Sequence, residues 1–173
     1  MGLGLRDARD QGVAVRHREG AKAAEACELA ALLREKGHQV GLIDANGLDL
    51  DYRELEARFR RQAFDALIFR FTPTTFDHDA RAAQLAKDVR PDARTIGISW
   101  TLRTLPKEVL REAPFMDVYL RHEYESVGPA LVDALDEGKT LAEVPGIAFR
   151  DAGHVEVTRD ATPFPDYDAL PLP

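Results

Sequence analysis

The sequence is poor in cysteine, because Cys27 is the only one in 173 residues. A single thiol cannot close a disulfide within the chain, complete a multi-cysteine zinc site or supply three ligands to an iron–sulfur cluster. Long apolar runs are also missing, since the stretch 63–71 (AFDALIFRF) is short and interrupted by charge. This pattern argues against a membrane span and a signal peptide, so we expect a cytoplasmic protein without a membrane partner.

Positive charge is in deficit as well, with 23 Lys and Arg against 30 Asp and Glu and a formal net charge of −7. Such a chain repels phosphate backbones, and we therefore expect no nucleic-acid partner. The patterns GxGxxG, GxxxxGK[ST], HExxH and GxSxG do not occur, and the five histidines are scattered. No nucleophile stands beside a base, so the sequence favours a binding module over a self-contained enzyme.

What the sequence does contain is a regular alternation of β-rich and helical segments. The helical segment 22–36 has apolar residues at helical spacing and Gly37 as a C-cap, and Asp51 with Glu54 forms a capping-box pattern. Parallel strands need crossover helices that bury both faces of the sheet. We therefore predict an α/β, Rossmann-like (flavodoxin-like), doubly wound and mostly parallel five-stranded sheet. The expected helices are 22–36, 51–62, 77–89, 106–112 and 126–137, and the expected later strands are 39–44, 65–71, 94–99 and 116–121.

The two ends of the chain depart from this alternation. Residues 13–15 are the only candidate for the first strand, and charged neighbours make residues 1–20 an uncertain N-terminal segment. The Rossmann-like domain then covers 21–160. Segments 146–150 and 154–158 flank Asp-Ala-Gly and predict a small C-terminal β-hairpin outside the repeat. Residues 161–173 are Pro-rich and are expected to be a linker.

Ligands of doubly wound sheets bind beyond the carboxyl ends of the strands, so the loops after the strands are the candidate site. These loops are 16–20, 72–76, 99–104 and 122–125. Loop 72–76 places three threonine hydroxyls and a proline just before a predicted helix. Loop 122–125 contains hydrogen-bond donors and acceptors and one aromatic side chain. The candidate cofactor-binding residues are Phe71, Thr72, Pro73, Thr74, Thr75, Gly97, Ser99, Trp100, Thr101, His122, Glu123, Tyr124 and Glu125; no residue is a candidate catalytic group or metal ligand.

Each of these loops also has a purely structural interpretation. Thr75 or Asp77 is equally suited to cap the following helix. Trp100, the only tryptophan, is as well explained by a core position under the helices. Glu125 is suited to lie exposed near a helix N-terminus. The sequence leaves these alternatives open.

Four blocks of sequence, in order and spacing, resemble the N-terminal cobalamin-binding domain of the cobalamin-dependent radical S-adenosylmethionine enzymes. They are ELAALLREKGHQVGLIDAN (28–46), FTPTTFDHDARAAQLAKDVRPDA (71–93), LPKEVLREAPFMDVYLRHEYE (105–125) and VPGIAFRDAGHVEV (144–157). The ending PFPDYDALPLP is similar to the Pro-rich connection that leads into the catalytic barrel of the family. The resemblance covers about residues 25–173.

The resemblance implies that cobalamin binds across the strand ends. Loop 72–75 would lie near the corrin ring, and 97–101 with Glu123 or Glu125 near the nucleotide tail. Trp100 and Leu102 add bulk where the family has small residues, and His122 and Tyr124 replace two glycines. The Asp-x-His-x-x-Gly motif that supplies an axial histidine in other cobalamin proteins is missing. The implied cobalamin is therefore base-off, without a histidine ligand from the protein.

The CxxxCxxC motif of the family cannot occur in a chain with one cysteine. The iron–sulfur cluster and S-adenosylmethionine are therefore expected in a C-terminal radical SAM domain outside this sequence, and this domain is the expected partner. The chain would be the non-catalytic, cofactor-binding part of an enzyme of methyl transfer or related radical chemistry.

Two alternatives remain beside this interpretation. One is a degenerate Rossmann-like domain that serves protein–protein interaction without a cofactor, in which case a homodimer is expected. The other is an enzyme with another cofactor such as flavin, for which the sequence offers no motif.

Overall fold

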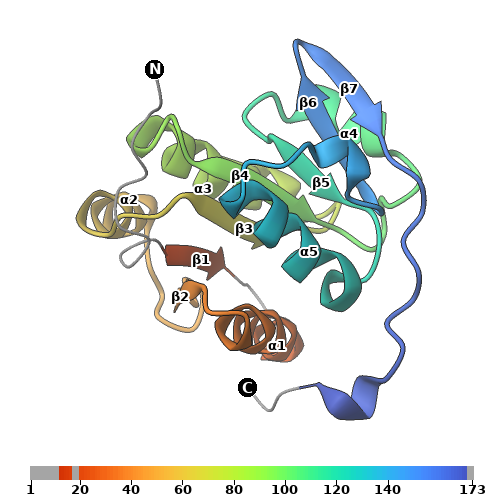
Figure 1. The fold of residues 1–173 in the computed structure, drawn as a ribbon. Helices are drawn as coiled ribbons and strands as arrows, with labels where there is room; N and C mark the ends of the chain where they lie inside the picture. The colour runs from red at the N-terminus through yellow and green to blue at the C-terminus, as the bar shows by residue number, and fades with distance from the viewer. Residues whose placement is uncertain (1–11, 17–19, 171–173) are drawn as a thin grey trace, which may run out of the picture.

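A computed structural model describes residues 12–16 and 20–170 of the chain. Within them the backbone forms one seven-stranded sheet in the order β2-β1-β3-β4-β5-β6-β7, with helices on both faces (Figure 1). The strands are β1 (Gly12–Arg16), β2 (Gln39–Leu42), β3 (Ala66–Arg70), β4 (Arg94–Ile98), β5 (Val118–Leu120), β6 (Ile147–Asp151) and β7 (His154–Val157). The helices are α1 (Gly20–Glu35), α2 (Tyr52–Arg61), α3 (Phe76–Val89), α4 (Pro106–Glu112) and α5 (Tyr124–Asp136), with 3-10 turns η1 (Leu141–Glu143) and η2 (Tyr167–Ala169).

The first five strands are all parallel, in the flavodoxin-like order 2-1-3-4-5, so the doubly wound prediction is confirmed. The uncertain first strand exists as β1, which pairs with β2 on one side and with β3 on the other. β1 forms backbone hydrogen bonds with a strand on each side. These bonds stabilise it as a strand although its apolar sequence is short. The chain order reverses between β1 and β3, which makes this the switch point of the sheet.

The C-terminal hairpin is present but belongs to the sheet, so the sheet has seven strands rather than the expected five. β6 pairs antiparallel with β5, and β7 pairs antiparallel with β6. The two-residue turn has positive φ at Ala152 (45°) and Gly153 (85°), as a type I′ turn requires. Ile147, Ala148 and Phe149 of β6 are buried, and pairing with β5 provides the partner that these apolar residues need.

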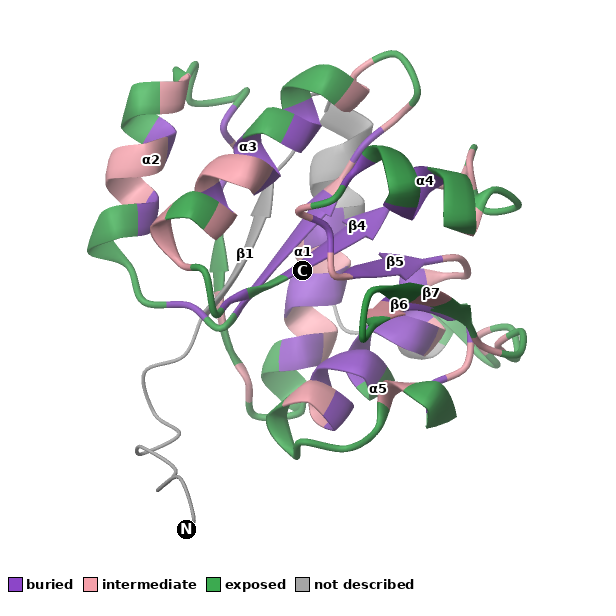
Figure 2. Ribbon diagram, turned by 90° about the horizontal axis from the view of Figure 1, so that it is seen from above, coloured by how far each residue is buried: buried purple, intermediate pink, exposed green. Residues whose placement is uncertain are grey.

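Two apolar cores lie on opposite faces of the sheet. α1 and α5 cover one core, to which Leu33, Ile96 and Leu131 contribute. α2, α3 and α4 cover the other, which includes Phe59 and Leu110. Figure 2 shows buried residues along the strands and on the inward sides of these helices. The sheet is therefore the rigid platform from which the loops at its carboxyl end project.

Helix ends agree with the sequence pattern within two residues, and the largest differences are at the starts of α1 and α5. Asp51 and Glu54 form the predicted capping box of α2. α5 begins at Tyr124, with Glu123 as its N-cap, so Tyr124 and Glu125 lie in its first turn and not in the expected loop. In the described part of the chain, no helix has the length and apolar character of a membrane span.

Candidate functional site

The three threonines of the β3–α3 loop form a hydroxyl cluster at the carboxyl end of β3. The Thr72 hydroxyl shares hydrogen bonds of 2.9 Å with the hydroxyls of Thr74 and Thr75. The Thr72 backbone N–H also donates to Thr75 Oγ1 at 3.1 Å. Thr75 occupies the N-cap position of α3 but makes no side-chain capping bond. The hydroxyls of the cluster thus bond to one another at the carboxyl end of β3 instead of capping α3. Within the loop, Pro73 and Thr74 are exposed.

Phe71 and Gly97, two further predicted site residues, are packing residues of the core. The Phe71 side chain is 1% exposed and its ring lies near those of Phe76 and Tyr119, with centroids at 5.3 and 6.0 Å. A Cβ at Gly97 would lie 2.7 Å from Met116 Sδ and 3.0 Å from Phe71 Cε1. Only a glycine fits at position 97 without displacing Met116 or Phe71. Phe71 packs in the core beside the loop rather than facing a ligand.

The β4–α4 loop contributes one buried and one half-buried group. Ser99 is 2% exposed, and its Oγ has no hydrogen-bond partner among the residues that the structure describes. Its carbonyl accepts a hydrogen bond of 2.7 Å from the Tyr119 hydroxyl. Trp100 packs against the α1–α5 core and meets Tyr124 edge-on, with ring centroids at 6.5 Å. Trp100 is thus partly buried against the core, and it contacts a residue from the segment that follows β5. Thr101, by contrast, is exposed.

The first turn of α5 places a buried carboxyl group beside a buried phenol. Tyr124 donates a hydrogen bond of 2.8 Å to Glu28 of α1. Glu125 is 8% exposed, and its Oε2 has no hydrogen-bond partner within the described ranges. Burial, together with the charges of Glu123 and Glu28, raises the pKa of Glu125, although hydrogen bonds from its backbone and from Tyr124 oppose this rise. The interpretation of Glu125 as an exposed loop residue is therefore wrong.

His122 and Glu123 face the C-terminal segment of the chain. His122 Nε2 lies 3.1 Å from Asp160 Oδ1, and Glu123 Oε2 accepts a hydrogen bond of 3.1 Å from the Phe164 backbone N–H. Hydrogen bonding to Glu123 raises the pKa of Tyr167 to about 12. Two of the four polar residues predicted in this loop are thus engaged by residues 160–167.

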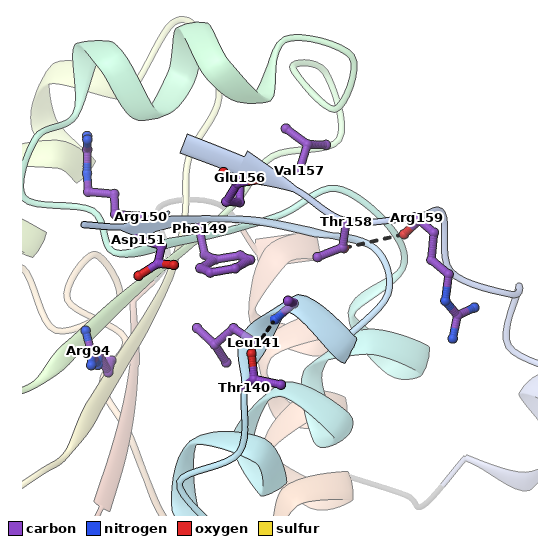
Figure 3. Close-up of a pocket in the computed structure, with 11 residues that line it drawn as sticks. Arg94, Thr140, Leu141, Phe149, Arg150, Asp151, Glu156, Val157, Thr158 and Arg159 are labelled. Atoms are coloured by element: carbon purple, nitrogen blue, oxygen red, sulfur yellow. Dashed lines mark hydrogen bonds between the residues drawn. The ribbon is translucent and has the colours of Figure 1, made fainter. Parts of the chain in front are cut away.

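A pocket of about 740 Å³ lies along the β6–β7 hairpin and reaches Thr158 and Arg159, which directly precede Asp160 (Figure 3). Its wall begins at Arg94, the first residue of β4, and continues over η1 and both strands of the hairpin. Phe149 and Leu141 point into it, with Asp151 close by (Figure 3). None of the predicted site residues lines this pocket, and the sequence pattern gave no signal for it.

The carboxyl-end site thus has three neighbouring contributions, from the ends of β3, β4 and β5. The loop after β1 was also predicted here, but residues 17–19 lie outside the described part of the chain. Sequence reasoning missed Glu28, Tyr119 and Asp160, because a helix-face glutamate, a strand tyrosine and a tail aspartate carry no motif. No group of three or more potential metal ligands occurs among the described side chains.

This arrangement defines a flavodoxin-like domain with a group of polar side chains at the carboxyl ends of its parallel strands. No protein-family model matches the chain. The chain is 31% identical over 154 residues to an uncharacterised methyltransferase of Pyrococcus horikoshii, an alignment that covers 83% of this chain and 33% of the relative. It is 33% identical over 150 residues to the anaerobic magnesium-protoporphyrin IX monomethyl ester cyclase of Rubrivivax gelatinosus, covering 82% of this chain and 26% of that protein.

Solved structures with the same fold include two cobalamin-dependent radical enzymes. The radical S-adenosylmethionine methyltransferase TsrM of Kitasatospora setae, with cobalamin and a [4Fe-4S] cluster bound, matches with a TM-score of 0.74 and 14% identity, over 94% of this chain and 31% of that one. The cobalamin-dependent radical enzyme OxsB, with aqua-cobalamin and S-adenosylmethionine bound, matches with a TM-score of 0.74 and 15% identity, over 90% of this chain and 23% of that one. The resemblance to this family is confirmed. The chain spans about a third or less of the length of these relatives.

Proposed function

We propose that this chain is a cobalamin-binding domain and that the corrin lies across the carboxyl ends of β3, β4 and β5. The observation that carries the proposal is a pair of buried acceptor groups at this edge, Ser99 Oγ and Glu125 Oε2, which have no partner in the described structure. A buried polar atom without a partner costs about 1–3 kcal/mol, so such atoms point to a ligand or to water. The fold of two cobalamin-dependent enzymes supports the choice of ligand.

The residues at this edge fit the chemistry of a corrin, which is a large apolar ring with amide-bearing arms. Glu125 Oε2 can accept a hydrogen bond from an amide N–H, and the Ser99 hydroxyl can donate or accept. Thr72 and Thr74 supply hydroxyls, and Trp100 supplies an aromatic edge. These residues would hold the cofactor by hydrogen bonds and by apolar contact.

Bound cobalamin would supply a cobalt centre for methyl transfer or a related radical reaction in a larger enzyme. The chain's own contribution is to bind and orient the cofactor. The iron–sulfur cluster and S-adenosylmethionine would bind to a radical SAM domain that follows residues 161–173 in the parent protein, and this domain would be the partner. The relatives are several times longer than the aligned region, which supports this division.

We also propose that the bound cofactor is base-off and has no histidine ligand from the protein. His78 is engaged with the Tyr52 hydroxyl through Nδ1 at 2.9 Å. His122 is held at Asp160. Electron paramagnetic resonance of the cob(II)alamin complex is expected to show cobalt lines without splitting by an axial nitrogen. Nitrogen splitting that disappears in His122→Ala would contradict this.

The binding proposal is tested by mixing the purified protein with hydroxocobalamin, removing the free cofactor and recording the visible spectrum. We expect retained corrin absorbance, and a Kd that rises about tenfold in Glu125→Gln, since a charge-assisted hydrogen bond is worth about 1.5–3 kcal/mol. Glu156→Gln is the matched control, because Glu156 is an exposed glutamate on β7, outside the site. A protein that retains no corrin, and that forms a dimer indifferent to cobalamin in light scattering, would instead be the interaction module.

A further inference from the structure

We propose that Arg121, His122 and Glu123 form a docking surface for the chain's own C-terminal segment, and that docking of this segment strengthens ligand binding at the neighbouring site. Residues 158–167 are called the strap. The coupling rests on the proposed function, whereas the docking surface stands on contacts within the described chain.

The strap is held on this surface by side chains at the end of β5. Arg121 donates to the Thr158 carbonyl and to Asp160 Oδ1, both at 3.0 Å. Asp160 Oδ1 also meets His122 Nε2 at 3.1 Å. Side-chain exposure is 16% for Arg121 and 29% for His122, against 74% for Asp160. The Arg121 guanidinium and the His122 ring are therefore largely covered, and both face one exposed carboxylate of the strap.

A second group of contacts holds the strap further along the chain. The Phe164 backbone N–H donates to Glu123 Oε2 at 3.1 Å. The rings of Phe164 and Tyr167 meet edge-on with centroids at 5.6 Å. Glu123 thus holds the strap at Phe164, and the ring contact extends this attachment to Tyr167. Figure 1 shows the chain leaving β7 and passing the α5 side of the molecule toward η2.

Gly146 allows the strap to approach this closely. Its φ is +80°, and an added Cβ would lie 2.8 Å from the Cβ of Ala161 and 3.3 Å from that of His122. The Gly146 N–H donates to the Arg159 carbonyl at 2.7 Å, and its own carbonyl accepts from the Arg121 N–H at 2.8 Å. A glycine is therefore built into the position where the strap and the docking surface meet.

Coupling follows from the position of Glu123, which is the N-cap of α5 and directly precedes Tyr124 and Glu125. A docked strap fixes His122 and Glu123, so the first turn of α5 is ordered before a ligand arrives. Because this turn is already ordered, the ligand does not have to order it on binding, and the entropy cost of that ordering no longer reduces the affinity. Linkage requires the reverse effect, because a ligand that binds better to the docked form must tighten docking by the same factor.

The experiment measures hydrogen exchange of the Phe164 amide and the Kd for hydroxocobalamin in the wild-type chain and in Asp160→Ala. Loss of an exposed ion pair is expected to speed Phe164 exchange about two- to fivefold without ligand. Saturating hydroxocobalamin is expected to slow this exchange in the wild-type chain. The Kd of Asp160→Ala should rise, by no more than the factor of that slowing. Glu156→Ala removes a carboxylate outside the strap and should change neither quantity.

The outcomes separate the docking surface from the coupling and from the proposed function. Unchanged Phe164 exchange in ligand-free Asp160→Ala overturns the docking surface. Faster exchange in this variant, combined with tight cobalamin binding that leaves Phe164 exchange unaltered in the wild-type chain, overturns the coupling alone. If the wild-type chain retains no corrin, the proposed function and the coupling fail together, and the ligand-free exchange still decides whether the strap docks.

Discussion

Glu125 combines two properties that rarely coincide in a structural residue: its side chain is buried, and one of its carboxylate oxygens lacks a partner in the described structure. A buried carboxylate without full hydrogen bonding destabilises the fold. The proposed binding role accounts for such a group at the carboxyl end of the sheet, since binding sites commonly sacrifice stability for function.

Glu125→Gln is therefore expected to stabilise the ligand-free protein at pH 7 by about 1 kcal/mol while weakening cobalamin binding. Burial raises the pKa of this carboxyl, so its contribution to stability is favourable below the pKa of the unfolded chain and is lost as the pH rises through the folded value. The gain from glutamine should thus be present at pH 7 and vanish near pH 4. Urea unfolding at both pH values measures it, and a glutamine variant that is less stable than wild type at pH 7 would contradict the argument.

At the scale of elements, periodicity predicted the later strands and every helix of the repeat within a few residues. It underestimated β1, because the strength of a central strand comes from its two neighbours and not from its own short pattern. It also left the hairpin outside the sheet, since pairing of β6 with β5 depends on an edge that no local pattern reveals. The start of α5 at Tyr124 was missed for a similar reason, as burial of Tyr124 and Glu125 is a tertiary effect.

The candidate site was predictable in position but not in detail. Strand ends located the three loops, because the carboxyl ends of parallel strands share one edge. The sequence could not show that Phe71 and Gly97 serve the core, or that His122 and Glu123 bind the strap. These distinctions depend on side-chain direction, which differs between neighbouring residues of one loop.

Gly97 provides a test of how tightly β4 is packed against its neighbours. Gly97→Ala is expected to cost about 1–3 kcal/mol, because its Cβ would lie 2.7 Å from Met116 Sδ and Cε. Met116→Leu removes this thioether end and should alone cost less than about 1.5 kcal/mol. The double variant is therefore expected to lose less stability than the sum of the two single variants. Urea unfolding of all four proteins gives the coupling free energy, and strict additivity would show that Met116 does not limit the space at Gly97.

At the scale of the whole molecule, two buried tyrosines, one in each apolar core, form hydrogen bonds near the carboxyl end of the sheet. Tyr119 donates to the Ser99 carbonyl, and Tyr124 donates to Glu28. Burial raises the pKa of both phenols well above the ordinary value, and at Tyr124 the nearby carboxylates raise it further. Both phenols are therefore neutral in the folded chain under conditions in which an exposed tyrosine ionises.

The protein is consequently expected to lose stability steeply above about pH 10, the ordinary pKa of tyrosine. There the unfolded chain releases the two phenolic protons while the folded chain keeps them, so the unfolded state binds fewer protons and the free energy of unfolding falls as the pH rises. Each phenol contributes up to about 1.4 kcal/mol per pH unit. In Tyr119→Phe with Tyr124→Phe, stability at pH 7 should be lower, because the Ser99 carbonyl loses its donor, but the decline between pH 10 and 11 should be shallower. Urea unfolding across this pH range compares the two slopes. Equal slopes would mean that these phenols ionise as readily in the folded chain as in the unfolded one. The carboxyl end of the sheet would then be more open to water than the burial of Tyr119 indicates.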